Sequence, residues 1–271
     1  MDTRTSVGER TLAIELADQI SAWLRDQLEW SGADRFVLGL SGGIDSAVVA
    51  GLAARAVGSD RVFAVMMPAA SNPSDLESAA LVAQAFGIPA TTIDLTAPTQ
   101  SLRAVLPSAP DVQERLGLPS APPAEAVQLA DANIKPRLRM ATLYYVANLC
   151  RGIVLGTGNK TEAMIGYFTK YGDGGVDLLP IVDLYKREVR EVARAIGVPQ
   201  QVIERPPSAG LWQGQTDEDE IGITYDELDR TLEGIESGDT RDADPATVER
   251  VMQMVASSEH KRQRIPRFSR D

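Results

Sequence analysis

The pattern of apolar and polar positions divides much of the chain into alternating strands and helices. A short apolar run at 36–40 predicts a strand that is buried on both faces, and the runs at 62–67, 91–95 and 152–156 predict three further strands. Apolar residues at near-helical spacing predict helices at 11–30, 47–58, 75–86 and 124–150, with Ser74 as an N-cap and a break at Pro136. Strands that alternate with helices are typical of an α/β domain with a parallel sheet and right-handed crossovers.

The remaining segments are loops and C-terminal helices. Residues 107–123 are rich in proline and show little periodicity, so we expect a loop there. The acidic run 217–220 is interpreted as a solvated face. Because no repeat or low-complexity linker interrupts the pattern, we expect a single domain over residues 1–271. Helices are expected at 183–196, 225–235 and 245–258, followed by a basic tail at 260–267.

Composition and charge exclude several classes of protein. The net charge of −11 argues against nonspecific nucleic-acid binding, which needs Lys and Arg to neutralise phosphates. No apolar run reaches the roughly 20 residues that span a bilayer, and the N-terminus does not resemble a secretory signal. We therefore expect a cytoplasmic protein. With Cys150 the only cysteine and His260 the only histidine, a zinc site of several histidines and a Ser-His-Asp triad are disfavoured.

A glycine-rich stretch, Gly39-Leu-Ser-Gly-Gly-Ile-Asp-Ser46, joins the first predicted strand to its helix. A strand, a glycine turn and a helix in this order direct backbone N–H groups and the positive helix end at one point, which suits a phosphate. Gly42 and Gly43 let an anion approach the backbone, and Ser41 and Ser46 add hydroxyl donors. A carboxylate beside a phosphate needs a cation between the two, so Asp45 points to Mg²⁺.

Two better-known glycine loops do not match this stretch. The P-loop of NTPases requires a Lys after its glycines, and the dinucleotide fingerprint requires G-x-G-x-x-G. The order Ser-Gly-Gly-x-Asp-Ser instead resembles the pyrophosphate loop of ATP pyrophosphatases, which activate a substrate oxygen by adenylation.

A second strand-to-loop junction, Thr157-Gly-Asn-Lys-Thr-Glu162, follows the strand at 152–156. In a parallel sheet both junctions lie at the carboxyl edge, where open α/β sheets bind ligands. The polar, glycine-rich segment 166–177 carries three aromatic residues, which favours contact with a ligand or an interface.

Together these segments resemble the NAD synthetases. The resemblance covers about residues 11–267 and implies a Rossmann-like parallel sheet flanked by helices, of the adenine nucleotide alpha-hydrolase-like type, with C-terminal helices. The matching segments are Asn133-Ile-Lys-Pro-Arg-Leu-Arg-Met140, Asn159-Lys-Thr-Glu162, Gly166-Tyr-Phe-Thr-Lys-Tyr-Gly-Asp173, Leu179-Pro-Ile, Pro207-Ser-Ala-Gly-Leu-Trp-Gln-Gly-Gln-Thr-Asp-Glu218 and Ser258-Glu-His-Lys261.

The resemblance implies a two-step reaction with ATP as co-substrate. The carboxylate of deamido-NAD is adenylated with release of pyrophosphate, and a nitrogen nucleophile then displaces AMP to give NAD. Glutamine-using members carry a glutaminase domain with a nucleophilic cysteine. Because Cys150 lies in an apolar helix and no such domain precedes residue 11, we expect the ammonia-dependent form. A separate glutaminase partner is the alternative source of nitrogen.

The resemblance also implies roles for individual residues. Asp45 and Glu162 would hold Mg²⁺, and Asp45, Lys186 and Ser208 would be catalytic. Lys186 also stands out physically, because a cation in the first turn of a helix is unfavourable to the helix dipole. The implied ATP-binding residues are Gly39, Leu40, Ser41, Gly42, Gly43, Ile44, Asp45, Ser46, Thr157, Lys186 and Ser208. The implied deamido-NAD-binding residues are Arg137, Lys170, Asp177, His260 and Lys261, with the substrate bound across a homodimer interface formed by residues 137–150.

Two alternatives stay open at this point. One is another pyrophosphate-loop enzyme, such as a GMP synthetase-type amidase or a tRNA-thiolating enzyme, although the latter would need a basic surface or cysteine pairs. The other is a non-catalytic adenine-nucleotide sensor, which has no evident use for the paired carboxylates Asp45 and Glu162.

Overall fold

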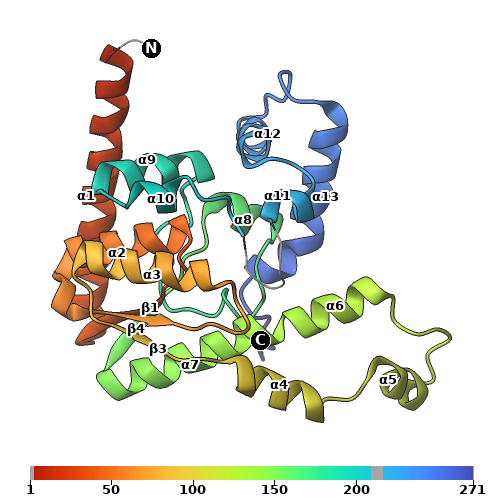
Figure 1. The fold of residues 1–271 in the computed structure, drawn as a ribbon. Coiled ribbons are helices and arrows are strands. Elements are labelled where there is room, and N and C mark those ends of the chain that lie inside the picture. Colours follow the sequence, from red (N-terminus) through yellow and green to blue (C-terminus); the bar gives the residue numbers. More distant parts are fainter. Residues whose placement is uncertain (1–2, 209–215, 271) are drawn as a thin grey trace.

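Four parallel strands form the sheet at the centre of the fold, in the order β3-β2-β1-β4 (Figure 1). The computed structural model describes residues 3–208 and 216–270. The strands are β1 (Arg35–Gly39), β2 (Val62–Met66), β3 (Ala90–Thr92) and β4 (Gly152–Leu155). Phe36 of β1 lies opposite Val62 on one side and Ile153 on the other, so β1 is an inner strand. The predicted parallel α/β fold is confirmed.

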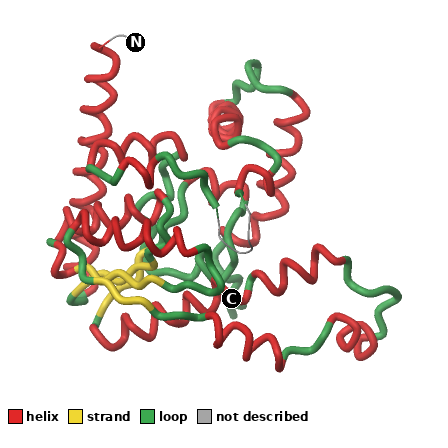
Figure 2. Tube along the Cα trace, in the orientation of Figure 1, coloured by secondary structure: helices red, strands yellow, loops and turns green. Residues whose placement is uncertain are grey.

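Helices cover both faces of this sheet and extend beyond it. On one face lie α1 (Thr3–Ser31), α2 (Ile44–Val57), α3 (Pro73–Phe86) and α9 (Lys186–Ile196), and on the other lies α7 (Ile134–Cys150). The other elements are the 3-10 turn η1 (Ser59–Arg61) and the helices α4 (Thr96–Val105), α5 (Ala109–Leu116), α6 (Ala124–Ala132), α8 (Lys160–Ile165), α10 (Gln200–Ile203), α11 (Asp217–Ile221), α12 (Tyr225–Ser237) and α13 (Pro245–Arg262). Figure 2 shows α4, α5 and α6 reaching away from the sheet. In the described part of the chain, no helix is long and apolar enough to cross a membrane.

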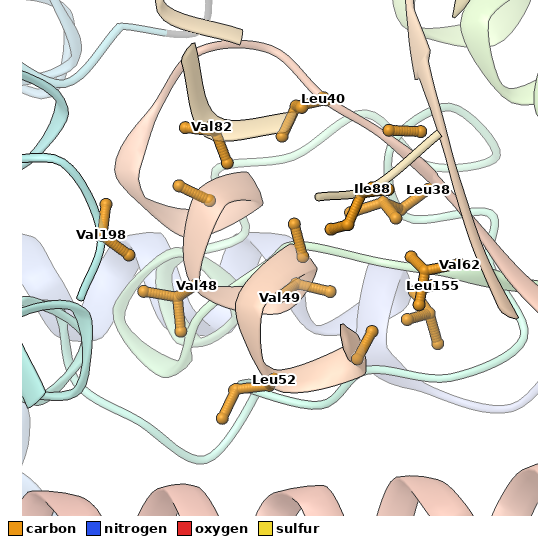
Figure 3. Packing of buried hydrophobic residues seen from close by; sticks show 14 of the residues in the cluster. Leu38, Leu40, Val48, Val49, Leu52, Val62, Val82, Ile88, Leu155 and Val198 are labelled. Atoms are coloured by element: carbon orange, nitrogen blue, oxygen red, sulfur yellow. The ribbon is translucent and has the colours of Figure 1, made fainter. Parts of the chain in front are cut away.

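Three apolar clusters hold these layers together. The largest packs Val48, Val49 and Leu52 of α2 against Leu38 and Leu155 of the sheet (Figure 3). A second cluster joins the opposite face of the sheet to α7, and a third joins α8 to α12 and α13. Burial of a Val or Leu side chain contributes about 1.5–3 kcal/mol, so these clusters fix α2, α9 and α7 on the sheet and α8 against α12 and α13.

The structure differs from the predicted elements mainly at their ends. The third strand was expected at 91–95, but β3 ends at Thr92 and is a short edge strand with exposed and half-buried residues. The interpretation of 107–123 as a loop is wrong in part, because Ser108 and Asp111 form a capping box that starts α5. The cap of α3 is Asn72 rather than Ser74, since its side chain accepts the Ser74 N–H.

Further differences affect α7, α9 and α13. The chain turns at Asn133, and Pro136 lies in the first turn of α7, where a missing N–H is tolerated. Helix α9 begins at Lys186, after a turn, and not at Asp183. Helix α13 runs on to Arg262, so the first residues of the expected basic tail are its last turn.

Candidate active site

The carboxyl ends of β1 and β4 form a topological switch point. The chain leaves β1 for β2 on one side, whereas β4 pairs with β1 on the other side. In open α/β sheets ligands bind in the crevice at such a point. The segments 39–46 and 157–162 start from these two neighbouring strand ends, as predicted, and therefore face the same crevice.

The loop between β1 and α2 is held in one conformation by close packing and by its own hydroxyls. Gly42 has φ +85°, and a Cβ there would lie 2.3 Å from the carbonyl oxygen of Asp75, so only glycine fits. Gly43 is extended, with φ −86°, at the N-cap position of α2. The hydroxyls of Ser41 and Ser46, predicted to be ligand donors, bond within the loop. Ser46 Oγ donates to the Gly43 carbonyl at 3.0 Å, and Ser41 Oγ accepts the Gly43 N–H at 3.2 Å.

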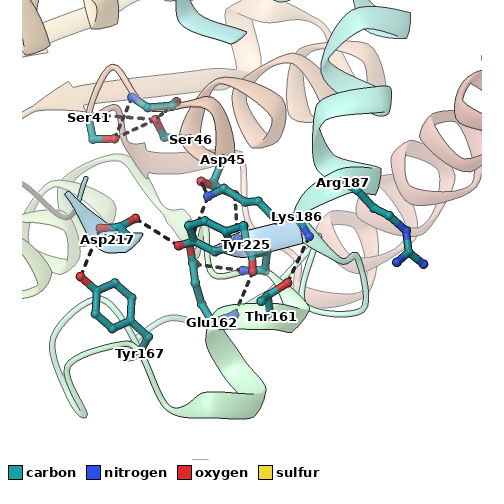
Figure 4. Close-up of polar contacts among 12 residues, drawn as sticks. Ser41, Asp45, Ser46, Thr161, Glu162, Tyr167, Lys186, Arg187, Asp217 and Tyr225 are labelled. Carbon is teal, nitrogen blue, oxygen red and sulfur yellow. Dashed lines mark hydrogen bonds and ion pairs between the residues drawn. The ribbon is translucent and has the colours of Figure 1, made fainter. Parts of the chain in front are cut away.

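A buried ammonium lies beside this loop (Figure 4). Lys186 Nζ is 2.7 Å from Asp45 Oδ2 and 3.3 Å from Glu162 Oε1, and its side chain is 1% exposed. Asn159 is fully buried between the two carboxylates. Its Nδ2 donates to Asp45 Oδ1 at 2.9 Å, and its Oδ1 accepts the Glu162 N–H at 3.0 Å. Residues from three separate elements, Asp45, Glu162 and Lys186, therefore meet at the switch point.

Tyr225 and Asp217 extend this cluster toward α11 and α12. The Tyr225 hydroxyl lies 3.2 Å from Glu162 Oε1 and 3.1 Å from Asp217 Oδ2. The ammonium of Lys186 stands 4.6 Å from the centre of the Tyr225 ring, a cation–π distance. Tyr167 donates to Asp217 Oδ1 and contacts Glu220 Oε2 at 2.7 Å. A polar network thus runs from the glycine loop to the start of α11.

The carboxylates in this cluster outnumber the ammonium. Burial raises the pKa of Glu162 to about 7, because the charges of Asp45 and Asp217 add to the effect of burial and Lys186 only partly opposes it. Burial alone would lower the pKa of Lys186, but the charges of Asp45 and Glu162 more than reverse this, so its pKa lies above the ordinary value. Lys186 is therefore a permanent cation, and the cluster retains an excess of negative charge.

A cavity of about 410 Å³ lies next to Lys186 and Ile44 of the glycine loop. Its lining includes Arg190 and Arg194, which follow Lys186 at intervals of four residues on one face of α9, and also Arg205. Arg190 pairs with the exposed Asp226, and Arg205 pairs with Asp75 at the start of α3. In a protein of net charge −11, this is a local concentration of positive charge that suits phosphate groups.

Four of the five residues expected to bind deamido-NAD lie together at the end of α13. Lys170 Nζ donates to the His260 carbonyl at 2.7 Å, and Arg137 approaches the Lys170 carbonyl at 3.5 Å. Lys261 Nζ donates to the carbonyls of residues 166 and 168, at 2.6 and 2.7 Å. Asp177 instead accepts bonds from the Tyr144 hydroxyl and the Val154 N–H, each at 2.8 Å, which connect it to α7 and β4.

Thr157 and Ser208 are the other two predicted ATP-binding residues outside the glycine loop. Thr157 is half-buried just beyond β4, and Ser208 is exposed. Ser208 is the last described residue before residue 216, and the part of the motif at 209–215 lies outside the described residues. The roles assigned to the individual site residues stay predictions.

Sequence reasoning missed three members of the cluster. The position of Asn159 at a helix start could be predicted from the sequence, because Asn followed by Glu three residues later is a capping-box pattern. The interpretation of 217–220 as a solvated face is wrong for Asp217, which is 4% exposed and bonded to Tyr225. Tyr225 follows the N-cap of α12 and carried no signal that set it apart from other core aromatics.

The parallel sheet, the pyrophosphate-type loop at its carboxyl edge and the adjoining carboxylates define the protein as an α/β enzyme of the ATP-using kind. Comparison with known proteins narrows this class. The model of the family described as NAD synthase matches residues 16–265, and the chain belongs to that family. Its homologues are ligases that form a C–N bond.

Several relatives match over nearly their whole length. The NH(3)-dependent NAD(+) synthetase of Archaeoglobus fulgidus is 46% identical over 93% of this chain and 95% of its own. That of Methanocaldococcus jannaschii is 40% identical over 92% and 94%. Among solved structures, the NMN synthetase from Francisella tularensis has a TM-score of 0.79 at 34% identity and covers 94% of this chain and 99% of that chain. An NH3-dependent NAD synthetase from Campylobacter jejuni, at 24% identity, shares the fold with a TM-score of 0.77 and covers 95% and 99%.

Proposed function

We propose that the protein amidates deamido-NAD to NAD with ammonia and ATP, through an adenylated intermediate, releasing AMP and pyrophosphate. The observation that carries the proposal is the convergence of Asp45, Glu162 and Lys186 at the switch point of a chain of the NAD synthase family. Adenylation gives the carboxylate a good leaving group. Cationic side chains stabilise the charge that develops on the departing pyrophosphate.

For ATP, we propose that residues 39–46, Thr157, Lys186 and Ser208 bind the nucleotide. Two features of the structure support this. The glycine loop ends at the N-terminus of the 14-residue helix α2, whose dipole favours an anion. The cavity lined by Lys186, Arg190 and Arg194 adds positive charge on the adjoining side.

For Mg²⁺, the donor set of the cluster fits the ion. Mg²⁺ is usually held by one or two carboxylates together with water and phosphate oxygens. Asp45 and Glu162 supply two carboxylates around a point where a cation already lies, and the nearby Asp217 leaves their negative charge in excess. Within residues 3–208 and 216–270, no group of three His, Cys, Asp or Glu side chains forms a complete metal cage. When bound at Asp45 and Glu162, the ion would neutralise charge on the ATP phosphates.

For deamido-NAD, we propose Arg137, Lys170, Asp177, His260 and Lys261, with the substrate site at a homodimer interface. The gathering of four of these residues at the end of α13 supports a common site. Helix α7 supports the dimer, because Tyr145 and Leu149 on its outer face are 66% and 72% exposed. Large apolar side chains exposed together on one helix are typical of a protein–protein interface.

Incubation with ATP, Mg²⁺, deamido-NAD and ammonium, followed by quantification of NAD and AMP, tests the proposal. We expect NAD and AMP in equal amounts. ATP binding without turnover would instead favour a nucleotide sensor, and turnover of xanthosine monophosphate or tRNA would favour another pyrophosphate-loop enzyme. Asp45→Asn should remove turnover while leaving the circular dichroism spectrum unchanged.

The likeness to the Francisella tularensis NMN synthetase supports a second candidate substrate. If this chain made NMN by the same amidation, its substrate would be nicotinic acid mononucleotide. The same assay therefore includes both acids as competing substrates. A higher kcat/KM for the mononucleotide would replace the dinucleotide proposal.

A further inference from the structure

We propose that Tyr225 is a positioning residue for the cation site. Tyr225 holds Glu162 and Lys186 in the geometry that the ion and the phosphates require. The inference rests on the proposed function, because it takes Asp45 and Glu162 as the carboxylates that hold the ion. Neither Tyr225 nor α12 belongs to the two strand-end segments that supply these carboxylates.

The Tyr225 side chain is enclosed where several parts of the chain meet. It is 0% exposed at the first position of α12, and its backbone N–H donates to Glu218 Oε1 at 2.8 Å. In Figure 4 its ring lies beside Lys186 and its hydroxyl points to Glu162 and Asp217. A buried ring with its backbone bonded in this way has little freedom to move, so it can hold more mobile side chains in place.

Glu162 gains a fixed orientation from the Tyr225 hydroxyl. Glu162 Oε2 accepts the Asn159 N–H at 3.3 Å, whereas Oε1 is 3.2 Å from the Tyr225 hydroxyl and 3.3 Å from Lys186 Nζ. A carboxylate has about four lone-pair positions, and the Tyr225 hydroxyl, Lys186 Nζ and the Asn159 N–H take three of them, so one position on Oε2 is left for an ion. Groups that hydrogen-bond to a metal-binding carboxylate typically change metal affinity 10- to 100-fold when they are removed.

Lys186 is held by the ring of the same residue. Its ammonium lies 4.6 Å from the ring centre, and its backbone N–H donates to Thr161 Oγ1 at 3.1 Å. The ring attracts the ammonium without neutralising it, so Lys186 keeps its charge for the carboxylates or for phosphates. One side chain thus positions both a carboxylate and a cation of the proposed site.

The chain contains a second cluster with the same chemistry, away from Asp45 and Glu162. Tyr185 is also buried, its hydroxyl bonds to Glu236 Oε2 at 2.6 Å, and Lys160 Nζ lies 4.6 Å from its ring centre. Glu236 lies at the opposite end of α12 from Tyr225. Tyr185→Phe therefore removes the same hydroxyl from a similar arrangement of tyrosine, carboxylate and lysine, although Glu236 is more exposed than Glu162, and it is the control for Tyr225→Phe.

The experiment measures Mn²⁺ binding to the full chain by electron paramagnetic resonance, in the presence of a non-hydrolysable ATP analogue. We expect Tyr225→Phe to weaken Mn²⁺ binding about tenfold or more. Tyr185→Phe should stay within about twofold of wild type. In a Glu162→Gln background, Tyr225→Phe should cause no further loss, because the hydroxyl acts through Glu162.

The outcomes separate the inference from the proposed function. If wild type and Asp45→Asn bind Mn²⁺ equally, the proposed cation site is wrong. If Asp45→Asn weakens binding but Tyr225→Phe does not, or if both Tyr variants weaken it equally, Tyr225 is not a positioning residue. Circular dichroism verifies folding, and a variant that is unfolded is measured again in trimethylamine N-oxide, which favours the folded state.

Discussion

Lys186→Met is the most direct test of the buried cluster. Methionine retains a long apolar side chain but removes the ammonium. Asp45 Oδ2 and Glu162 Oε1 then lose the cation that lies 2.7 and 3.3 Å away. The negative charge of Asp217, which also acts on Lys186, remains nearby.

The structure sets the size of the expected effect. Removal of one partner from a buried ion pair costs about 3–5 kcal/mol, because the other charge stays buried without compensation. The side chains of Asp45 and Glu162 are 18% and 16% exposed, so water reaches them in part and we expect about 3 kcal/mol. For a chain of this size, each kcal/mol changes Tm by roughly 2–4 °C. The Tm of Lys186→Met should therefore fall by about 6–12 °C.

Scanning calorimetry in EDTA measures this change, with Lys160→Met as the matched control. Lys160 pairs with Glu236 at 2.8 Å and Asp183 at 3.6 Å, but these carboxylate side chains are 42% and 94% exposed. Solvent screens such pairs, so we expect a loss of about 1 kcal/mol or less. Millimolar Mg²⁺ should raise the Tm of Lys186→Met more than that of Lys160→Met, because only the first variant lacks a cation at Asp45 and Glu162. Equal losses in the two variants would refute the reasoning.

Three further predictions follow from the same geometry. In EDTA, Glu162 has a pKa of about 7 in the folded protein, above its ordinary value of 4.5, so the folded state binds more protons and loses stability as pH rises between these values. In urea denaturation, the free energy of unfolding of the wild type should fall by about 3 kcal/mol relative to that of Glu162→Gln over that pH range. A difference that stays constant with pH would contradict this prediction. In steady-state kinetics, Lys170→Met should raise the KM for deamido-NAD about tenfold and leave the KM for ATP nearly unchanged. Equal changes in the two KM values would indicate a role in folding alone. Leu149→Asp should convert a dimer to a monomer in light scattering, and an unchanged mass would exclude α7 as the interface.

The core of the fold could be predicted from the sequence because its strands are short apolar runs. The runs at 36–40, 62–67 and 152–156 correspond to β1, β2 and β4, and their parallel arrangement placed two junctions at one edge. The edge strand β3 was less predictable, since an edge strand is not buried on both faces and its apolar pattern is weaker. Helix α5 was hidden by prolines, although the Ser108 and Asp111 pair is a recognisable cap.

The site was predictable where a local pattern or the family resemblance carries the chemistry. Asp45 lies within a glycine motif that indicates a cation by itself, whereas Glu162 was identified through the resemblance to the NAD synthetases. Tyr225 is 63 residues from Glu162 in the sequence, and its pairing depends on how α12 packs against α8. The composition of the acidic run 217–220 is the same whether all its carboxylates are solvated or one of them is buried. The burial of Asp217 could therefore not be predicted from the sequence.

The cluster at the switch point lies between two of the apolar clusters, one on the sheet and one on α13. Asp45 and Lys186 belong to α2 and α9, which pack on the sheet, whereas Glu162 and Tyr225 belong to α8 and α12, which pack on α13. Asp229 of α12, 1% exposed, connects these helices, because it accepts bonds from Thr161 Oγ1 of α8 and from the Arg187 N–H of α9. The distance between the two site carboxylates is therefore set by the neighbouring ends of β1 and β4 and by the Asn159 bridge, and the docking of α12 adds a second constraint through Tyr225 and Asp229. Changes far from the crevice, in the packing of α12 and α13, should alter the cation site before they alter the glycine loop.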